Sequence, residues 1–205
     1  MTPANKAKIH ALNDRLLDWI AVEQVGDVIG ELGERLGDDA MLRIGRHYRE
    51  GFVAWRFAER RGADSLRLLK EQPSGTTPDF EIDLKGELLR YETTEADVPG
   101  RKRQAEYRVP RTVERMLFTD LDTMVAHMRV LAAKKAAKIY DNCRGLVIWV
   151  NPPAFAFVPE LRWQGLVSGA EPAAAAFEEV WALRGTGSLL WHNGIPQPEI
   201  RGEEF

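Results

Sequence analysis

Two alternating segments joined by Lys85-Gly86 constrain the fold of this chain more than any other feature. Apolar Phe80, Ile82 and Leu84 alternate with acidic residues, and after the turn Leu89, Tyr91 and Thr93 alternate with Arg90, Glu92 and Thr94. This is the pattern of half-buried strands. A two-residue connection between two such segments predicts a β-hairpin. In that hairpin we expect Glu81 to face Arg90, because the short turn fixes which residues pair.

The same register sets Asp79 directly opposite Glu92, with β-carbons roughly 4.5–5.5 Å apart. Like charges in this position destabilise a sheet, so their placement indicates a bound cation. Mg²⁺ prefers hard oxygen ligands and is usually held by one or two carboxylates together with water and substrate phosphates. Thr94 points to the same face as Glu92, because side chains alternate along a strand. The alternative interpretation is a solvated hairpin that carries no site.

The order Pro78-Asp79, hairpin, Glu92-Thr93-Thr94 resembles the PD-(D/E)XK nuclease-like superfamily. This resemblance implies a restriction-endonuclease-like core in which Asp79 and Glu92 bind Mg²⁺ or Mn²⁺, with the Thr93 carbonyl as a further ligand. In the superfamily a Lys at the position of Thr94 helps to activate the attacking water. A Thr hydroxyl carries no charge for that task.

The substitution at Thr94 leaves several functions open. The first is a metal-dependent nuclease, either endo- or exonuclease, that acts on nucleic-acid phosphodiesters with impaired or relocated catalysis. The second is a non-catalytic member of the same fold that binds nucleic acid or protein. The third is a binding module unrelated to nucleases.

A helix is expected before the first strand, from about Ala40 to Arg61, with Asp38-Asp39 as its N-cap and Gly62 as its stop. The family resemblance implies that a Glu on this helix points into the metal site and joins the catalytic residues. Glu50 is the first candidate and Glu59 the second. Glu50 could equally pair with Arg46 or Arg49 in the same helix.

The densest positive segment of the chain follows the second acidic motif. Within residues 101–115 there are six basic residues and two acidic ones. The family resemblance implies that a helix here contacts the nucleic-acid backbone, and a charged loop without a ligand is the alternative. The candidate contacts are Arg101, Lys102, Arg103, Gln104, Tyr107 and Arg108.

A long amphipathic helix is predicted from Thr119, with Asp122 completing a capping-box-like start, to about Tyr140. The continuously apolar run Leu146–Val150 then predicts a buried strand. A strand, a helix and a second strand in this order form a crossover, which normally pairs the two strands in parallel. Late in the helix lie Lys134, Lys135 and Lys138. Lys134 and Lys138 share a face and could replace the Lys missing at position 94, although the helix dipole alone also favours lysines there.

The two ends of the chain carry less specific patterns. Residues 5–36 predict one helix and a second, shorter one, which pack beside the sheet or contact a second copy or another protein. Near the C-terminus we expect a helix through Ala173–Leu183 and a strand over Ser188–His192. His192 is interpreted as structural or exposed.

These patterns predict one α/β domain over residues 1–205, with an N-terminal helical addition in residues 1–37 and a core in residues 38–205. The core is a mixed central β-sheet flanked by helices. We expect a cytoplasmic protein without a membrane partner, because the sequence shows no secretory signal, no membrane span and one cysteine, Cys143. A net charge of −3 argues against a generic DNA-coating protein, so any DNA-binding surface must be local.

Overall fold

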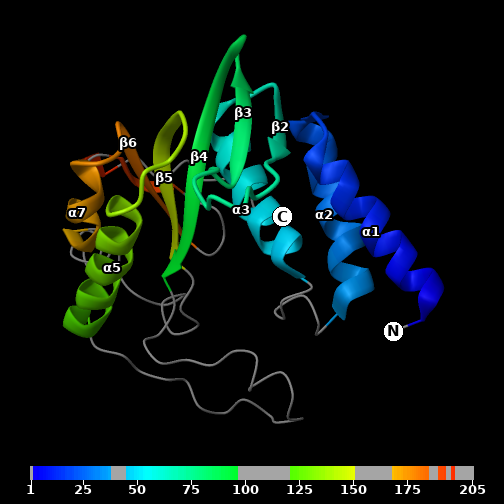
Figure 1. Cartoon of the computed structure of the whole chain (residues 1–205), viewed down its shortest axis with the longest axis horizontal. Coiled ribbons are helices and arrows are strands. Elements are labelled where there is room, and N and C mark those ends of the chain that lie inside the picture. The colour runs from blue at the N-terminus through cyan, green and yellow to red at the C-terminus, as the bar shows by residue number, and fades with distance from the viewer. Residues whose placement is uncertain are drawn as a thin grey trace. The chain divides into compact units, whose positions relative to one another are not determined.

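The computed structural model describes residues 2–37, 45–96, 121–150, 168–184, 189–192 and 195–196. These residues form two compact units, one up to Arg90 and one from Tyr91 onward. Strand β4 (Glu87–Ala96) contributes to both, because its residues up to Arg90 belong to the first unit and those from Tyr91 to the second. Figure 1 labels the elements.

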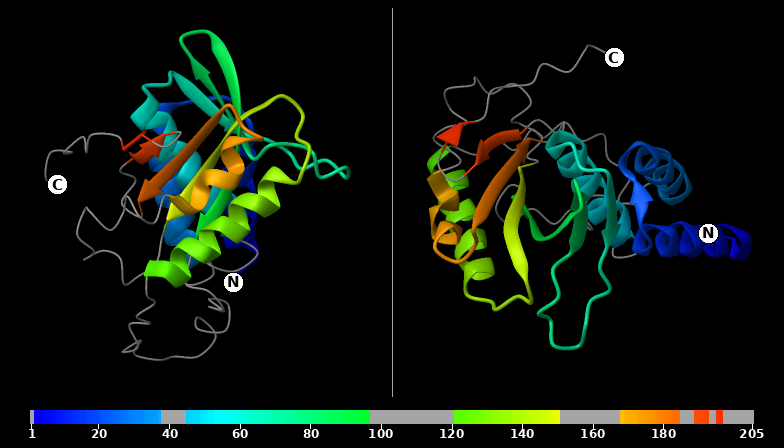
Figure 2. Two further views of the ribbon diagram at one scale, coloured as in Figure 1. Left: turned by 90° about the vertical axis from the view of Figure 1, so that its left-hand side faces the viewer. Right: turned by 90° about the horizontal axis from the view of Figure 1, so that it is seen from above.

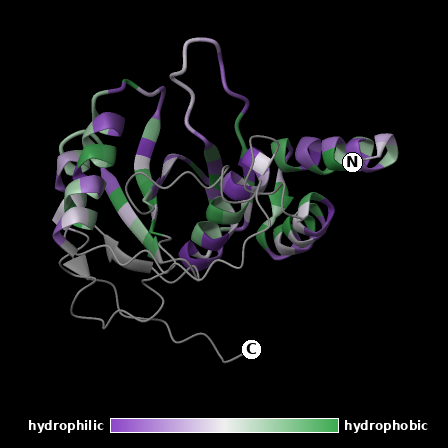
Figure 3. Ribbon diagram, turned by 90° about the horizontal axis from the view of Figure 1, so that it is seen from below, coloured by the Kyte–Doolittle hydropathy of each residue, from purple (hydrophilic) through white to green (hydrophobic). Residues whose placement is uncertain are grey.

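The first unit contains three helices: α1 (Pro3–Leu17), α2 (Val22–Leu36) and α3 (Arg46–Arg61). Helix α1 begins at Thr2, whose hydroxyl accepts a hydrogen bond from the Asn5 amide at 3.2 Å, as an N-cap should. In α2 the buried residues recur at helical spacing: Val22, Val25, Val28, Ile29, Leu32 and Leu36. Figure 3 shows the resulting mixture of hydrophobic and hydrophilic residues around these helices.

The prediction of two helices in this N-terminal region is confirmed, but the predicted difference in their lengths is wrong. Helices α1 and α2 have the same length, 15 residues, so the second is not shorter. Between them lies a two-residue strand, β1 (Ile20–Ala21), which the sequence pattern did not indicate. So short a strand leaves no periodicity to detect, and it exists because it pairs with β2.

The strands of the first unit form an antiparallel arrangement in the order β1, β2 (Ser65–Leu68), β3 (Phe80–Leu84) and the start of β4. Helix α3 packs against β2 and β3, and the rings of Phe57 and Phe80 meet edge to face at 5.8 Å. Gly62 ends α3 in the left-handed conformation, with φ of 65°, as predicted. The predicted start of this helix, at Asp38, Asp39 and Ala40, lies outside the described residues.

The predicted hairpin is confirmed. Lys85 and Gly86 connect β3 to β4 with φ angles of 57° and 86°, the positive values that a two-residue type I′ turn requires. The Arg90 Nε atom donates to Glu81 Oε1 at 2.8 Å, so these two residues are paired as expected.

The second unit contains the rest of the sheet and the helices that cover it. Its elements are α5 (Leu121–Ala136), β5 (Cys143–Val150), the 3₁₀ turn η4 (Ser168–Ala170), α7 (Glu171–Ala174), β6 (Glu179–Arg184), β7 (Leu189–His192) and β8 (Ile195–Pro196). The strands lie in the order β4, β5, β6, β7, β8. Since β5 and β6 are parallel and β6 and β7 antiparallel, the sheet is mixed.

One face of this sheet packs against α5, as Figure 2 shows. Met124, Met128 and Ala132 of the helix share a buried cluster with Leu146 and Ile148 of β5. The long helix and the buried strand were both predicted, although Thr119 lies outside the described residues.

The prediction of a helix through Ala173–Leu183 is wrong. Helix α7 ends at Ala174, and residues Glu179–Arg184 form strand β6. Val180, Trp181, Ala182 and Leu183 are all buried, which suits a strand with neighbours on both sides. The alanine run has high helix propensity, but pairing with β5 and β7 overrides it from Glu179 onward.

The chain is therefore a mixed α/β protein whose mixed sheet is flanked by helices, as predicted. The restriction-endonuclease-like arrangement of the core stays a prediction. Among the described residues, no helix combines the length and the apolar character that crossing a bilayer requires.

Candidate functional site

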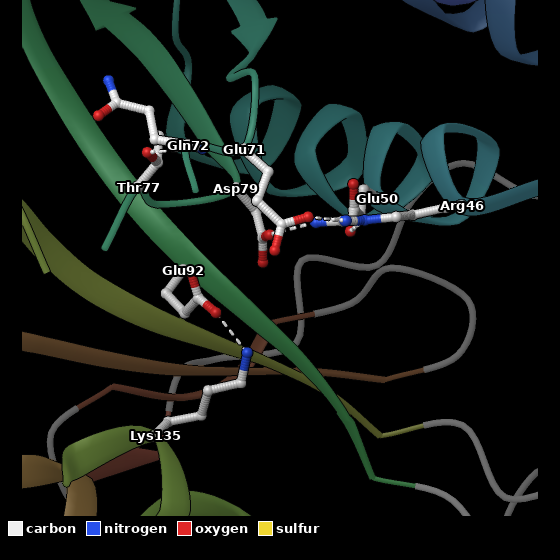
Figure 4. Close-up of polar contacts among 8 residues, drawn as sticks. All are labelled: Arg46, Glu50, Glu71, Gln72, Thr77, Asp79, Glu92 and Lys135. Atoms are coloured by element: carbon white, nitrogen blue, oxygen red, sulfur yellow. Dashed lines mark hydrogen bonds and ion pairs between the residues drawn. The ribbon is translucent and has the colours of Figure 1, made fainter. Parts of the chain in front are cut away.

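Arg46, in the first turn of α3, contacts three carboxylates of the first unit (Figure 4). Its Nε atom donates to Glu50 Oε1 at 2.6 Å, and its Nη1 atom donates to Glu71 Oε2 at 2.5 Å. Its Nη2 atom lies 3.7 Å from Asp79 Oδ1. One guanidinium thus joins the predicted residues Asp79 and Glu50 to Glu71, which the sequence analysis did not single out.

Local structure explains how these carboxylates reach one arginine. Arg46 and Glu50 are four residues apart in α3 and therefore share a face of the helix. Glu71 and Asp79 lie in the connection between β2 and β3, whose ends are joined by a hydrogen bond from the Leu69 amide to the Asp79 carbonyl at 2.9 Å. Within this loop the Gln72 amide donates to Thr77 Oγ1 at 3.3 Å, so the loop is internally supported.

Burial and charge shift the titration of this cluster. Burial raises the pKa of Glu50, the charge of Asp79 raises it further, and the contacts with Arg46 lower it, so that the pKa stands at about 7. Burial lowers the pKa of Arg46, but its hydrogen bonds to Glu50 and Glu71 outweigh this and the net shift is upward. Glu50 is therefore a carboxyl group that can exchange a proton near neutral pH.

The four side chains differ in their exposure to solvent. The exposed fraction is 12% for Asp79 and 20% for Glu50, against 45% for Arg46 and 60% for Glu71. Asp79 and Glu50 thus form the inner part of the cluster, and Glu71 the outer part.

Glu92 in the second unit is buried, with 4% of its surface exposed. Lys135 lies in the last turn of α5. Its Nζ atom donates a hydrogen bond to Glu92 Oε1, and the two side chains form an ion pair (Figure 4). The second acidic residue of the predicted motif therefore has a lysine beside it, and this lysine comes from a helix.

The sequence pattern favours Lys134 and Lys138, which share a face, as replacements for the missing lysine, whereas Lys135 is the residue that contacts Glu92. The apolar pattern of α5 contains the signal that would have selected Lys135. Met128 and Ala132 are buried against the sheet, and Lys135 follows them at intervals of seven and three residues, which places it on the same face.

The candidate Glu59 is paired with Arg56 at 2.7 Å and is exposed, whereas Glu50 lies beside Asp79. Glu50 makes the contact with Arg46 that was its alternative interpretation, and its role in a metal site stays a prediction. Thr93 and Thr94 are half-buried in β4. The predicted nucleic-acid contacts Arg101, Lys102, Arg103, Gln104, Tyr107 and Arg108 lie outside the described residues.

Asp79 and Glu92 belong to different units, so their pairing in one site stays a prediction. Within the part of the chain that the structure describes, no three Asp, Glu, His or Cys side chains are gathered to hold a metal ion. Glu50 and Asp79 nevertheless offer two carboxylates that converge on one cationic side chain. A pair of carboxylates, completed by water and phosphate oxygens, fits the way Mg²⁺ is usually held.

A second charged cluster of the first unit was not predicted as a site. Glu81 is buried and accepts hydrogen bonds from Arg67 on β2 and from Arg90 on β4, with the shortest contacts at 2.7 and 2.8 Å. Burial raises the pKa of Glu81, but the hydrogen bonds from the two arginines outweigh it, so the pKa lies below its ordinary value. This cluster joins three adjacent strands.

Comparison of the chain with family models, with curated proteins and with solved structures found no match. The function must therefore be inferred from the side chains themselves.

Proposed function

We propose that this protein is a metal-dependent nuclease that hydrolyses phosphodiester bonds of nucleic acid, with DNA as the expected substrate. Asp79 and Glu92 would hold Mg²⁺ or Mn²⁺ together with the Thr93 carbonyl, and Glu50 would stand beside them. The basic segment Arg101–Arg108 would contact the nucleic-acid backbone.

One observation carries this proposal: Lys135 lies against Glu92. Thr94 occupies the motif position where the superfamily has a lysine, and without that charge the resemblance would favour a binding protein. The ammonium of Lys135 supplies the missing charge from α5. Lys135 is paired with Glu92, the second acidic residue of the motif. The motif lysine that Thr94 replaces would act beside the same carboxylate.

The grouping of Asp79 with Glu92 is supported by the hairpin register. Glu81 pairs with Arg90, and Asp79 and Glu92 lie two positions farther along the same segments. If the register continues, the two carboxylates are opposite each other.

The side chains divide the chemistry between them. Bound Mg²⁺ or Mn²⁺ would polarise the scissile phosphate and lower the pKa of the attacking water. Glu50 would act as the general base that accepts the proton of that water. Lys135 can donate hydrogen bonds to the water or the phosphate and offset the negative charge that develops in the transition state.

A second function is favoured by a specific observation. Both acidic residues of the motif already have cationic partners, Arg46 for Asp79 and Lys135 for Glu92. A non-catalytic member of the fold, which binds nucleic acid or protein, would need no metal and would keep these ion pairs permanently.

The proposal predicts cleavage of linear or supercoiled DNA in the presence of Mg²⁺ or Mn²⁺. Asp79→Ala, Glu92→Ala and Lys135→Met should each lower the rate by about 10²- to 10⁴-fold, the usual contribution of such groups. Lys134→Met, next to Lys135 on α5, is the matched control and should retain activity. Cleavage is measured on gels and binding by mobility shift.

The outcomes separate the two functions. Binding without cleavage by the wild type would favour the non-catalytic member. Cleavage that survives both Asp79→Ala and Glu92→Ala would contradict the assigned site.

A further inference from the structure

The guanidinium of Arg46 lies beside Asp79, one of the two carboxylates that the proposed function assigns to the metal. It contacts Glu50 at 2.6 Å and approaches Asp79 to 3.7 Å. These are the two least exposed carboxylates of the cluster. An arginine side chain therefore already supplies the positive charge that their proximity demands.

The third contact of Arg46 differs from the other two. Glu71 is 60% exposed and lies in the loop that leads to Asp79, and its contact with Nη1 is 2.5 Å long. Exposed ion pairs are weak, because water screens them and both side chains lose freedom. Arg46 thus has an inner set of partners, Glu50 and Asp79, and an outer partner, Glu71.

We infer that Arg46 is an internal counter-ion for Glu50 and Asp79, and that a divalent cation at Asp79 must displace the Arg46 guanidinium from that carboxylate. This inference rests on the proposed function, because it concerns the same Asp79. It adds that competition from Arg46 lowers the affinity of the site for the metal.

Glu71, the outer partner of Arg46, also affects this competition. When Arg46 leaves Asp79, its long side chain can keep the contact with Glu71, so the guanidinium does not have to lose every ionic partner. Glu71 would therefore lower the cost of displacement. Arg46 and Glu71 should then be energetically coupled in metal binding, although Glu71 itself holds no metal.

Calorimetric titration with Mn²⁺ tests the inference. Arg46→Gln should tighten Mn²⁺ binding about tenfold, because one competing unit charge is removed beside the carboxylates. Glu71→Gln should weaken binding about threefold in the wild-type background and by less in the Arg46→Gln background, which is the signature of coupling. Arg35→Gln, which breaks the Arg35–Glu31 pair on α2, is the matched control and should leave binding unchanged.

A measurement on the wild type covers the case in which Arg46→Gln does not fold. The Nε–H resonance of Arg46, assigned by its loss in Arg46→Lys, should shift and exchange faster with water as Mg²⁺ is added. An unchanged resonance while Mg²⁺ binds would overturn the inference.

The results also distinguish this inference from the proposed function. Equal Mn²⁺ affinity in the wild type and in Arg46→Gln overturns the counter-ion role and leaves the nuclease proposal standing. No Mn²⁺ binding by the wild type and by Arg46→Gln overturns the metal site, and the counter-ion role falls with it.

Discussion

At the scale of single residues, Glu50 shows the conflict between burial and charge most clearly. Burial and the charge of Asp79 disfavour its charged carboxylate and outweigh Arg46 and Arg49, which favour it, so that its pKa rises to about 7. A half-buried carboxyl group with a raised pKa is costly to ionise, and such groups concentrate at functional sites.

The pKa of Glu50 predicts how stability depends on pH. Because the folded pKa of about 7 lies above the ordinary value of 4.5, the folded protein binds more protons than the unfolded chain between these pH values. Its free energy of unfolding therefore falls as the pH rises through this window, by up to about 3 kcal/mol from this group. Urea denaturation at pH 5 and pH 8 should show a smaller decline for Glu50→Gln than for the wild type.

The control for this measurement is Glu59→Gln, in the same helix and paired with Arg56. It should keep the wild-type decline. An equal decline in Glu50→Gln and in the wild type would show that Glu50 is not the titrating group.

Residue patterns named part of the candidate site and missed part of the cluster around Arg46. Asp79, Glu92 and Glu50 could be named because their order along the chain matches a motif. Glu71 could not, because its contact with Arg46 depends on how the loop after β2 folds back, and no periodicity records that. Lys135 could have been selected from the buried face of α5, but the choice between adjacent lysines depends on the rotation of the helix against the sheet.

At the scale of elements, the row of side chains across β2, β3 and β4 stabilises the first unit. Glu81 is buried between Arg67 and Arg90, and the guanidinium of Arg67 also lies 4.8 Å from the centre of the Trp19 ring. Either arginine alone still neutralises the carboxylate. Removing both would leave a buried charge without these two partners, which is far more costly.

This arrangement predicts non-additive substitutions. Arg67→Gln and Arg90→Gln should each lower the free energy of unfolding by about 1 kcal/mol, and the double variant by about 3–5 kcal/mol. The excess over the sum measures the coupling through Glu81. Urea denaturation at neutral pH gives all three values, and strictly additive effects would show that Glu81 does not couple the strands.

Lowering the pH should reduce the stability that the ion pairs of Glu81 with Arg67 and Arg90 contribute. Because the pKa of Glu81 is lowered in the folded protein, its contribution to stability is complete above pH 4.5 and is lost as the pH falls through the folded pKa.

Elements were predictable where local sequence determines them. The hairpin needs a turn of two residues with positive φ and two alternating segments, and all of these can be read from the chain. Strand β6 was mistaken for a helix because it is buried on both sides and follows an alanine run. Its strand conformation comes from parallel pairing with β5, in which partners such as Gly145 and Glu179 are 34 positions apart in the sequence.

At the scale of the whole molecule, the chain consists of two compact units that share β4. The mixed α/β class followed from the order of strands and helices, because a strand, a long helix and a buried strand limit the topologies available. The two acidic motif residues fall on either side of the division, Asp79 in the first unit and Glu92 in the second. The proposal that Asp79 and Glu92 form one site is supported by the sequence motif and by the hairpin register.

Anomalous diffraction from crystals grown with Mn²⁺ tests that proposal most directly. We expect one Mn²⁺ peak within coordinating distance of both the Asp79 and the Glu92 carboxylates, with the Thr93 carbonyl nearby. Asp79→Asn and Glu92→Gln should each abolish the peak. A wild-type crystal with Mn²⁺ bound to only one of these carboxylates, or to neither, would contradict the proposal.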